Sequence, residues 1–426
     1  MALFVHDINE QPNAFTTTLS QIPTAVGIHD PGSFATAALD IYENGWISPN
    51  NAWILNLWPP GFILLEVSIV KIFGINTPII LILQIIASLL FSWVLALLYK
   101  FFSVQTKSYV AFGVPLLIFA FPVSRVFLLQ PIGLVLGESF SIGFFLLTLL
   151  YSIKSVEKKS VWYSVWAGVF LALSAYFRSQ FELILMGITG WALLMGLYLY
   201  IKKTSQTLRT AGKSIMISIV VAHTATIPWR LYHWKYQGSP LWTQTSGVTF
   251  ENSVLSPEEL EKKSGSLVVT GGGNLVCRIN PTVCNDRENA RHLFFKTFFE
   301  NPSKWYAIKL SLIGKFWYTS VGGFWKTPNE VPSMSDLFIN SSFLSMLLAL
   351  PAMLVTRRVR SHPSWLPLTL LTIALFSTYI LIFTVQQFES RYFFFPKIVI
   401  TFIFLITASI FLRPKDVAQE LPTTSN

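Results

Sequence analysis

Runs of about twenty apolar residues recur along this chain and constrain its fold more than any other feature. A helix needs about 20 such residues to cross the hydrocarbon core of a bilayer, and in lipid the backbone must satisfy its own hydrogen bonds. The runs lie at 79–99, 108–128, 131–152, 161–177, 180–201, 213–229, 336–356, 364–385 and 392–412. Only 12% of the residues are charged, against roughly 25% in a soluble domain. We therefore expect an all-α polytopic membrane protein with about nine transmembrane helices.

The distribution of basic residues predicts the orientation of these helices. The net charge of +10 does not indicate a nucleic-acid partner, because the basic residues fall in short clusters between alternate apolar runs. These clusters are Lys100 and Lys107; Lys154, Lys158 and Lys159; Lys202, Lys203, Arg209 and Lys213; Arg357, Arg358 and Arg360; Arg413 and Lys415. Cytoplasmic loops carry the excess of lysine and arginine. These segments are therefore predicted to be cytoplasmic, and the segments between them extracytoplasmic.

A shorter apolar run at 59–74 is interrupted by Glu66 and Lys71. If this run crossed the membrane, the first 78 residues, whose only lysine or arginine is Lys71, would change sides. We instead expect an amphipathic helix that lies at the outer interface with its charged side chains among the headgroups.

These assignments divide the chain into six parts. The parts are an amino-terminal segment at 1–28 without a transmembrane helix, a first extracytoplasmic loop with interfacial helices at 29–78, six transmembrane helices at 79–229, a large extracytoplasmic loop at 230–335, three transmembrane helices at 336–412 and a cytoplasmic tail at 413–426.

The first extracytoplasmic loop begins with a polar helix in the stretch IHDPGSFATAALDIYENG. Asp30 is a typical helix N-cap and Pro31 suits the first helical position. Gly45 is a typical residue just past a helix end. We expect Asp40 to lie on a solvated face of this helix.

The two cysteines, Cys277 and Cys284, lie seven residues apart in the large loop. On an oxidising face a disulfide between them would persist, and two free thiols are the alternative. A zinc site is disfavoured, because neither His292 nor a further cysteine completes a ligand pattern.

Ionisable residues gather near the outer membrane surface in four segments. The segments carry His29 and Asp30; Glu138; Arg178 and Glu182; and Glu389, Arg391, Tyr392 and Lys397. Charges at membrane depth are costly and by default indicate function. Carboxylates and arginines together suit an anionic ligand with a general base. The structural alternatives are a helix cap at Asp30, an interfacial carboxylate at Glu138 and lipid-phosphate anchors at the two arginines.

The order of several short segments resembles a known family. They are the acidic helix with ENGWISP, WPPGFILLEVSIVKIFG, GESFSIGFFLL, AYFRSQFELIL, IPWRLYHWKYQGSPLWT, FFENPSKWYAIKLSLIGKFW and FESRYFFFP. Together they resemble the GT-C glycosyltransferases, which use polyprenyl-phosphate-linked sugars and include protein O-mannosyltransferases and the lipid A aminoarabinose transferase. The resemblance extends in order over 28–412.

The resemblance implies a GT-C-like bundle and a function. It implies transfer of a sugar from a polyprenyl-phosphate donor to a lipid, glycan or protein acceptor, with inversion, on the extracytoplasmic face of a bacterial plasma membrane. Asp30 would be the base and Glu138 a second catalytic carboxylate. The substrate-binding residues would be His29, Arg178, Arg230, Glu389, Arg391, Tyr392 and Lys397. Members of the family differ in sugar, acceptor and use of a divalent metal, and the sequence decides none of these.

Two departures from the family pattern keep other functions open. Trp58 stands where the family has a basic residue before Pro59 and Pro60, and the family's first transmembrane helix is missing from 1–28. The alternatives are an inactive truncated homologue and a transporter or flippase of a lipid-linked saccharide. Against a transporter, the chain shows no internal repeat of the kind common in transporters.

Overall fold

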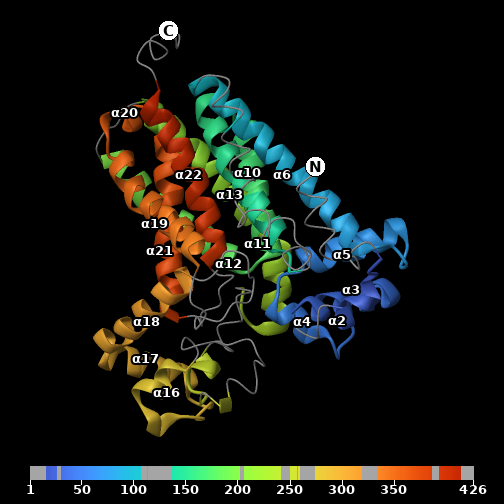
Figure 1. The fold of residues 1–426 in the computed structure, drawn as a ribbon. Helices are drawn as coiled ribbons and strands as arrows, with labels where there is room; N and C mark the ends of the chain where they lie inside the picture. The colour runs from blue at the N-terminus through green and yellow to red at the C-terminus, as the bar shows by residue number, and fades with distance from the viewer. Residues whose placement is uncertain are drawn as a thin grey trace. The chain divides into compact units, whose positions relative to one another are not determined.

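The computed structural model describes residues 16–25, 30–106, 113, 136–201, 206–240, 250–256, 258–259, 274–318, 333–385 and 393–413. Across these residues the chain forms helices and no strand. Figure 1 shows the helices coloured in chain order.

Seven helices in the described part of the chain are long and apolar enough to cross a membrane. They are α6 (Ile79–Gln105), α10 (Glu138–Glu157), α12 (Gln180–Ile201), α13 (Gln206–Gln237), α19 (Met334–Leu354), α21 (Trp365–Val385) and α22 (Phe394–Leu412). The run at 161–177 forms α11 (Val161–Phe177), an apolar helix of 17 residues. The run predicted at 108–128 lies almost wholly outside the described residues. The protein is an all-α, multi-pass membrane protein.

Helix α10 begins seven residues later than the predicted span at 131–152. Gly137 precedes the helix in a left-handed conformation with φ of 72°, which glycine adopts without steric cost. A Cβ atom at this position would lie 3.1 Å from Cβ of Phe62. The backbone conformation and close packing at Gly137 therefore place Glu138 at the first position of α10.

Small residues allow the transmembrane helices to pack closely. A Cβ atom at Gly168 of α11 would collide with the backbone carbonyl of Ser218 on α13, and the Ser218 hydroxyl donates to the carbonyl of Ser164 at 2.9 Å. Small residues at helix contacts are typical of membrane proteins. Pro228 interrupts the hydrogen bonds of α13, and the Tyr176 hydroxyl of α11 donates nearby to the carbonyl of Ala225 at 2.9 Å.

The chain divides into two compact units. Unit 1 comprises Met1–Trp242, Met346–Ala374 and Ile398–Asn426, and unit 2 comprises Thr243–Ser345 and Leu375–Lys397. Besides most of the spans, unit 1 contains η2 (Leu19–Gln21), α2 (Ile22–Ala25), α3 (Asp30–Asn44), α4 (Ala52–Leu57), α5 (Gly61–Phe73) and α20 (Arg357–Arg360). Helices α19, α21 and α22 each have residues in both units.

In unit 2, the described residues of the large loop form four short helical elements. They are α16 (Leu275–Ile279), η3 (Pro281–Val283), α17 (Ala290–Glu300) and α18 (Pro302–Trp317). Their buried core consists of Val254, Leu275, Val276, Ala290, Phe294 and Trp305. The loop is therefore a small helical subdomain with its own apolar core.

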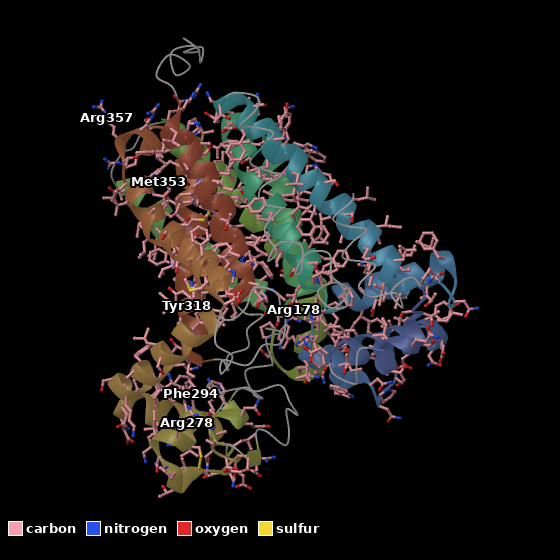
Figure 2. All side chains as sticks on the ribbon, in the orientation of Figure 1. Arg178, Arg278, Phe294, Tyr318, Met353 and Arg357 are labelled. Carbon is pink, nitrogen blue, oxygen red and sulfur yellow. A yellow bond between two sulfur atoms is a disulfide. The ribbon has the colours of Figure 1, made fainter. Side chains whose placement is uncertain are left out.

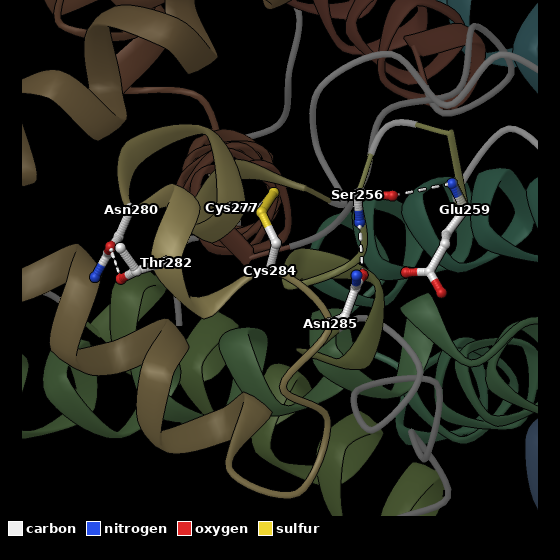
Figure 3. The surroundings of a disulfide bond; sticks show 7 residues. All are labelled: Ser256, Glu259, Cys277, Asn280, Thr282, Cys284 and Asn285. Carbon is white, nitrogen blue, oxygen red and sulfur yellow. Dashed lines mark hydrogen bonds between the residues drawn. A yellow bond between two sulfur atoms is a disulfide. The ribbon is translucent and has the colours of Figure 1, made fainter.

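A disulfide joins Cys277 of α16 to Cys284, which follows η3 (Figure 3). The next residue, Asn285, accepts a hydrogen bond from the backbone of Ser256 at 3.3 Å through its side chain, and its own N–H donates to the carbonyl of Val254. The disulfide and the Asn285 contacts hold the turn after α16 against the 254–256 segment.

We expect alkylation of the denatured, unreduced full-length protein to leave both cysteines unmodified, because each sulfur is held in the disulfide. Reduction before alkylation should add two alkyl groups, which mass spectrometry measures. Two alkyl groups without reduction would contradict the pairing.

Candidate functional site

The predicted acidic helix of the first loop forms and ends before Gly45 as expected, but Asp30 is its first helical residue and not the N-cap that precedes the helix. Helix α3 begins at Asp30 and ends at Asn44, and Gly45 follows with φ of 77° while its N–H donates to the carbonyl of Ile41 at 2.9 Å. Asp30 lies in the first turn and is half-buried. A carboxylate at this end of a helix is favoured by the helix dipole.

Asp40 does not lie on a solvated face, and that expectation is wrong. The residue is only 9% exposed, and its carboxylate accepts hydrogen bonds from the Asn44 amide at 2.8 Å, the Asn51 amide at 3.2 Å and the backbone N–H of Ser48. Burial alone would raise the pKa of Asp40, but the hydrogen bonds outweigh it and leave the pKa below its ordinary value. The turn after α3 folds back over the helix, so Asp40 ties α3 to the start of α4.

An aromatic cluster brings the segments that carry Asp30, Glu138 and Arg178 together. Phe62 of α5 lies 5.7 Å from Phe34 of α3, 6.2 Å from Phe140 of α10 and 6.5 Å from Phe177 of α11, measured between ring centroids. Such ring contacts add about 0.5–1.5 kcal/mol each beyond burial. Phe34 is one helical turn from Asp30, Phe140 is two residues from Glu138, and Phe177 directly precedes Arg178. The cluster therefore places these three ionisable residues at one end of unit 1.

A buried ion pair joins the start of α10 to the end of α11. Arg178 Nη2 lies 2.8 Å from Glu138 Oε1, and the two side chains are 11% and 5% exposed. The short connection to α12 holds Arg178 in place, because its carbonyl accepts the N–H of Phe181 at 3.1 Å. The other terminal nitrogen, Nη1, is buried and has no hydrogen-bond partner among the described residues. Figure 2 labels Arg178 at this end of α11.

A second pair of opposite charges lies on the neighbouring helices. Arg230 Nη2 of α13 is 3.8 Å from Glu182 Oε1 of α12, and the Glu182 side chain is fully buried. The separation exceeds a hydrogen bond, so this is a charge contact. Glu182 stands out in the sequence beside Arg178, but its pairing with Arg230 across 48 positions has no sequence signal.

The end of α13 also contacts the first loop. His233 Nε2 lies 3.2 Å from the carbonyl oxygen of Leu55 in α4. The ring centroid of Tyr232 lies 4.5 Å from that of Trp229 and 6.0 Å from that of Trp46. Trp229 and Tyr232 lie next to Arg230 on the last turns of α13.

Glu66 corrects the expectation that the charges of α5 lie among the headgroups. Its side chain is fully buried, and neither carboxyl oxygen has a hydrogen-bond partner among the described residues. Burial raises the pKa of Glu66 well above its ordinary value, which favours the protonated acid. Only Lys71 is exposed as expected. The signal was present in the sequence, because Glu66 follows Phe62 by four residues and precedes Val70 by four on one helical stripe.

None of the remaining predicted site residues can be assigned to this group of charges. His29, Glu389, Arg391 and Tyr392 lie outside the described residues. Lys397 is buried in unit 2, where its ammonium donates to the carbonyl of Trp317 at 2.8 Å and to Asn340 Oδ1 at 2.7 Å. Among the described residues, no three histidine, cysteine or carboxylate side chains are grouped as metal ligands.

The arrangement at this end of unit 1 combines an acidic helix start with two arginine–carboxylate pairs and the contacting rings of Trp46, Trp229 and Tyr232. Arginine suits phosphate because its planar group presents several donors. No protein-family model matches the chain, and no curated protein is significantly similar to it.

Removal of the Asp40 carboxylate should destabilise the first loop. Asp40→Ala removes three hydrogen bonds to a charged acceptor, and bonds of this kind contribute roughly 1.5–3 kcal/mol each, so we expect a loss of at least about 2 kcal/mol in unfolding free energy. The matched control is Glu43→Ala, which changes an exposed carboxylate of the same helix and should cost under about 0.5 kcal/mol. Titration with sodium dodecyl sulfate in mixed micelles measures both, and equal effects would contradict the role of Asp40.

Loss of one partner of the Arg178–Glu138 pair should lower the free energy of unfolding more than loss of both partners. Arg178→Gln leaves a buried carboxylate without its countercharge, and such changes cost about 3–5 kcal/mol. The double variant Glu138→Gln with Arg178→Gln should recover most of this loss in the same micelle titration. If the double variant loses as much unfolding free energy as Glu138→Gln and Arg178→Gln together, the two side chains do not interact.

Proposed function

We propose that this protein is a membrane glycosyltransferase that moves a sugar from a polyprenyl-phosphate donor to an acceptor on the extracytoplasmic face. The buried Arg178–Glu138 pair carries the proposal. A guanidinium held by one carboxylate, with a second buried nitrogen that no described residue bonds, is suited to bind a phosphate oxygen. Charge-assisted bonds of this kind are about twice as strong as neutral ones.

The proposed chemistry uses the charges at this end of unit 1. Asp30 takes the proton of the acceptor hydroxyl as the acceptor oxygen attacks the anomeric carbon. The bond from that carbon to the phosphate oxygen breaks, and polyprenyl phosphate leaves with the electron pair. Arg178 stabilises the negative charge that develops on the phosphate. Attack opposite the leaving group inverts the configuration of the sugar.

The position of Asp30 supports its role as the base. As the first residue of α3 it is held in place by the helix start, and it is half-buried. Phe34, one turn further on, contacts Trp58 and Phe62 with centroid separations of 5.3 and 5.7 Å. Asp30 therefore lies on a packed helix beside the aromatic cluster, close to the segments that carry Glu138 and Arg178.

The test is sugar transfer by the purified full-length protein. Polyprenyl-phosphate-linked sugars serve as donors, a membrane extract supplies acceptors, and release of polyprenyl phosphate is measured. Asp30→Asn should lower turnover by about 10²–10⁴-fold, since asparagine matches aspartate in shape but cannot accept the proton. The control is Glu43→Gln, an exposed residue of the same helix, which should transfer sugar as the wild type does.

Arg178→Lys separates phosphate recognition from stability. The variant keeps a positive charge beside Glu138 but loses the second terminal nitrogen, so we expect both weaker use of the donor and lower maximal turnover. Full activity of Asp30→Asn would contradict the assignment of the base. Movement of the donor across liposomes that lack any acceptor, without release of polyprenyl phosphate, would instead show a transporter.

A further inference from the structure

A second polar site lies elsewhere in unit 1, in a cavity of about 230 Å³. A water molecule in the liquid occupies about 30 Å³, so a phosphate group fits with room to spare. The walls come from α6, α10, the 362–363 connection and the residue after α22. Its lining residues include Lys100, Lys154, Glu157, Lys158, His362 and Arg413.

The charge of this cavity is strongly positive. Four cations face one carboxylate, Glu157. Among the described residues, the lysines at 100, 154 and 158 form no salt bridge. Lys154 Nζ lies 5.8 Å from the ring centroids of Tyr151 and Tyr163, and these rings hold it in place without neutralising its charge. The net positive charge of the lining therefore favours binding of an anion.

Two hydrogen bonds from Ser364 hold polar residues of the cavity lining in place. The Ser364 hydroxyl donates to Glu157 Oε1 at 3.0 Å, and the Ser364 N–H donates to His362 Nδ1 at 3.2 Å. Burial, together with the charge of Arg413, lowers the pKa of His362 to about 4. His362 is therefore neutral near pH 7, and the positive charge of the cavity comes from the three lysines and Arg413.

Orientation in the membrane alone does not explain this grouping. The positive-inside rule requires basic residues in cytoplasmic segments, but it does not require residues from α6, α10 and the carboxyl end of α22 to line one cavity. Much of the remaining wall is apolar and consists of Leu97, Phe101, Val104, Leu150, Ile153 and Pro363. Apolar contacts would not stabilise a soluble phosphate ion, whereas they would stabilise the acyl chain of a lipid.

We infer that this cavity binds the phosphate headgroup of an anionic membrane phospholipid, with the acyl chain along the apolar wall. Basic pockets between transmembrane helices on the cytoplasmic side bind such headgroups in other membrane proteins. The site is separate from the one proposed for the sugar donor and does not depend on that function. The predicted orientation places it in the cytoplasmic leaflet.

The test measures binding of phosphatidylglycerol to the full-length protein by native mass spectrometry. The protein is taken from micelles that hold defined mixtures of phosphatidylglycerol and phosphatidylcholine and no polyprenyl lipid. We expect the wild type to retain phosphatidylglycerol in preference to phosphatidylcholine. The double variant Lys100→Gln with Lys154→Gln should bind phosphatidylglycerol about 25-fold more weakly.

The matched control is Lys159→Gln with Lys213→Gln. Both residues are exposed, neither lines the cavity, and both are predicted to be cytoplasmic. This variant loses the same charge and should bind as the wild type does. Lys100→Gln alone changes one exposed side chain and should weaken binding about fivefold, which keeps the test valid if the double variant is less stable.

Equal loss of phosphatidylglycerol in the two double variants would overturn the inference, because a general charge effect would then explain binding. Retention unchanged in every variant would overturn it as well. Displacement of the lipid by inorganic phosphate at similar concentration would show a site for a soluble anion.

Discussion

The ion pair between Arg178 and Glu138 connects the transmembrane helices to the candidate site. The pair is buried at the start of α10 and the end of α11, where each charge without the other would be costly. Gly137 sets the start of α10 and the turn at Arg178 sets the end of α11, so the pair forms only when both helices end where they do. The aromatic cluster around Phe62 then packs α3 and α5 against the same helix ends. A change in either helix boundary would move the charges that we assign to the donor phosphate.

The two polar regions of unit 1 differ in the way their charges are arranged. At the candidate site each arginine faces a carboxylate, at 2.8 Å for Arg178 and 3.8 Å for Arg230. Such pairs hold the side chains in a fixed geometry, which the proposed sugar transfer would require. In the cavity around Lys154 the cations outnumber the single carboxylate, which suits retention of an anion without chemistry. Both regions combine charge with apolar walls, and we assign amphiphilic phosphate-bearing ligands to both.

Much of the fold could be predicted from the sequence, because apolar length and glycine signals act locally. The helix from Asp30 to Asn44 and most of the spans follow from such signals. Helix α10 was predicted to begin too early because the conformation of Gly137 depends on Phe62, a contact between distant parts of the chain. Asp40 and Glu66 were wrongly placed for related reasons. The partners of Asp40 come from the following turn, and Glu66 was judged by its charge although its helical position lies on the buried stripe. In the candidate site, the residue types were visible in the sequence, but the pairing of Glu182 with Arg230 was not.

The central claim is that the end of unit 1 around Arg178 binds a polyprenyl-phosphate-linked sugar. The most direct test is mass-spectrometric identification of the lipids that co-purify with the full-length protein from its native membrane. We expect a polyprenyl-phosphate-linked sugar bound to the wild type and much reduced in Arg178→Lys, which keeps the countercharge of Glu138, while Glu43→Gln retains it. Absence of any such lipid from the wild type, or equal amounts bound to wild type and Arg178→Lys, would contradict this claim.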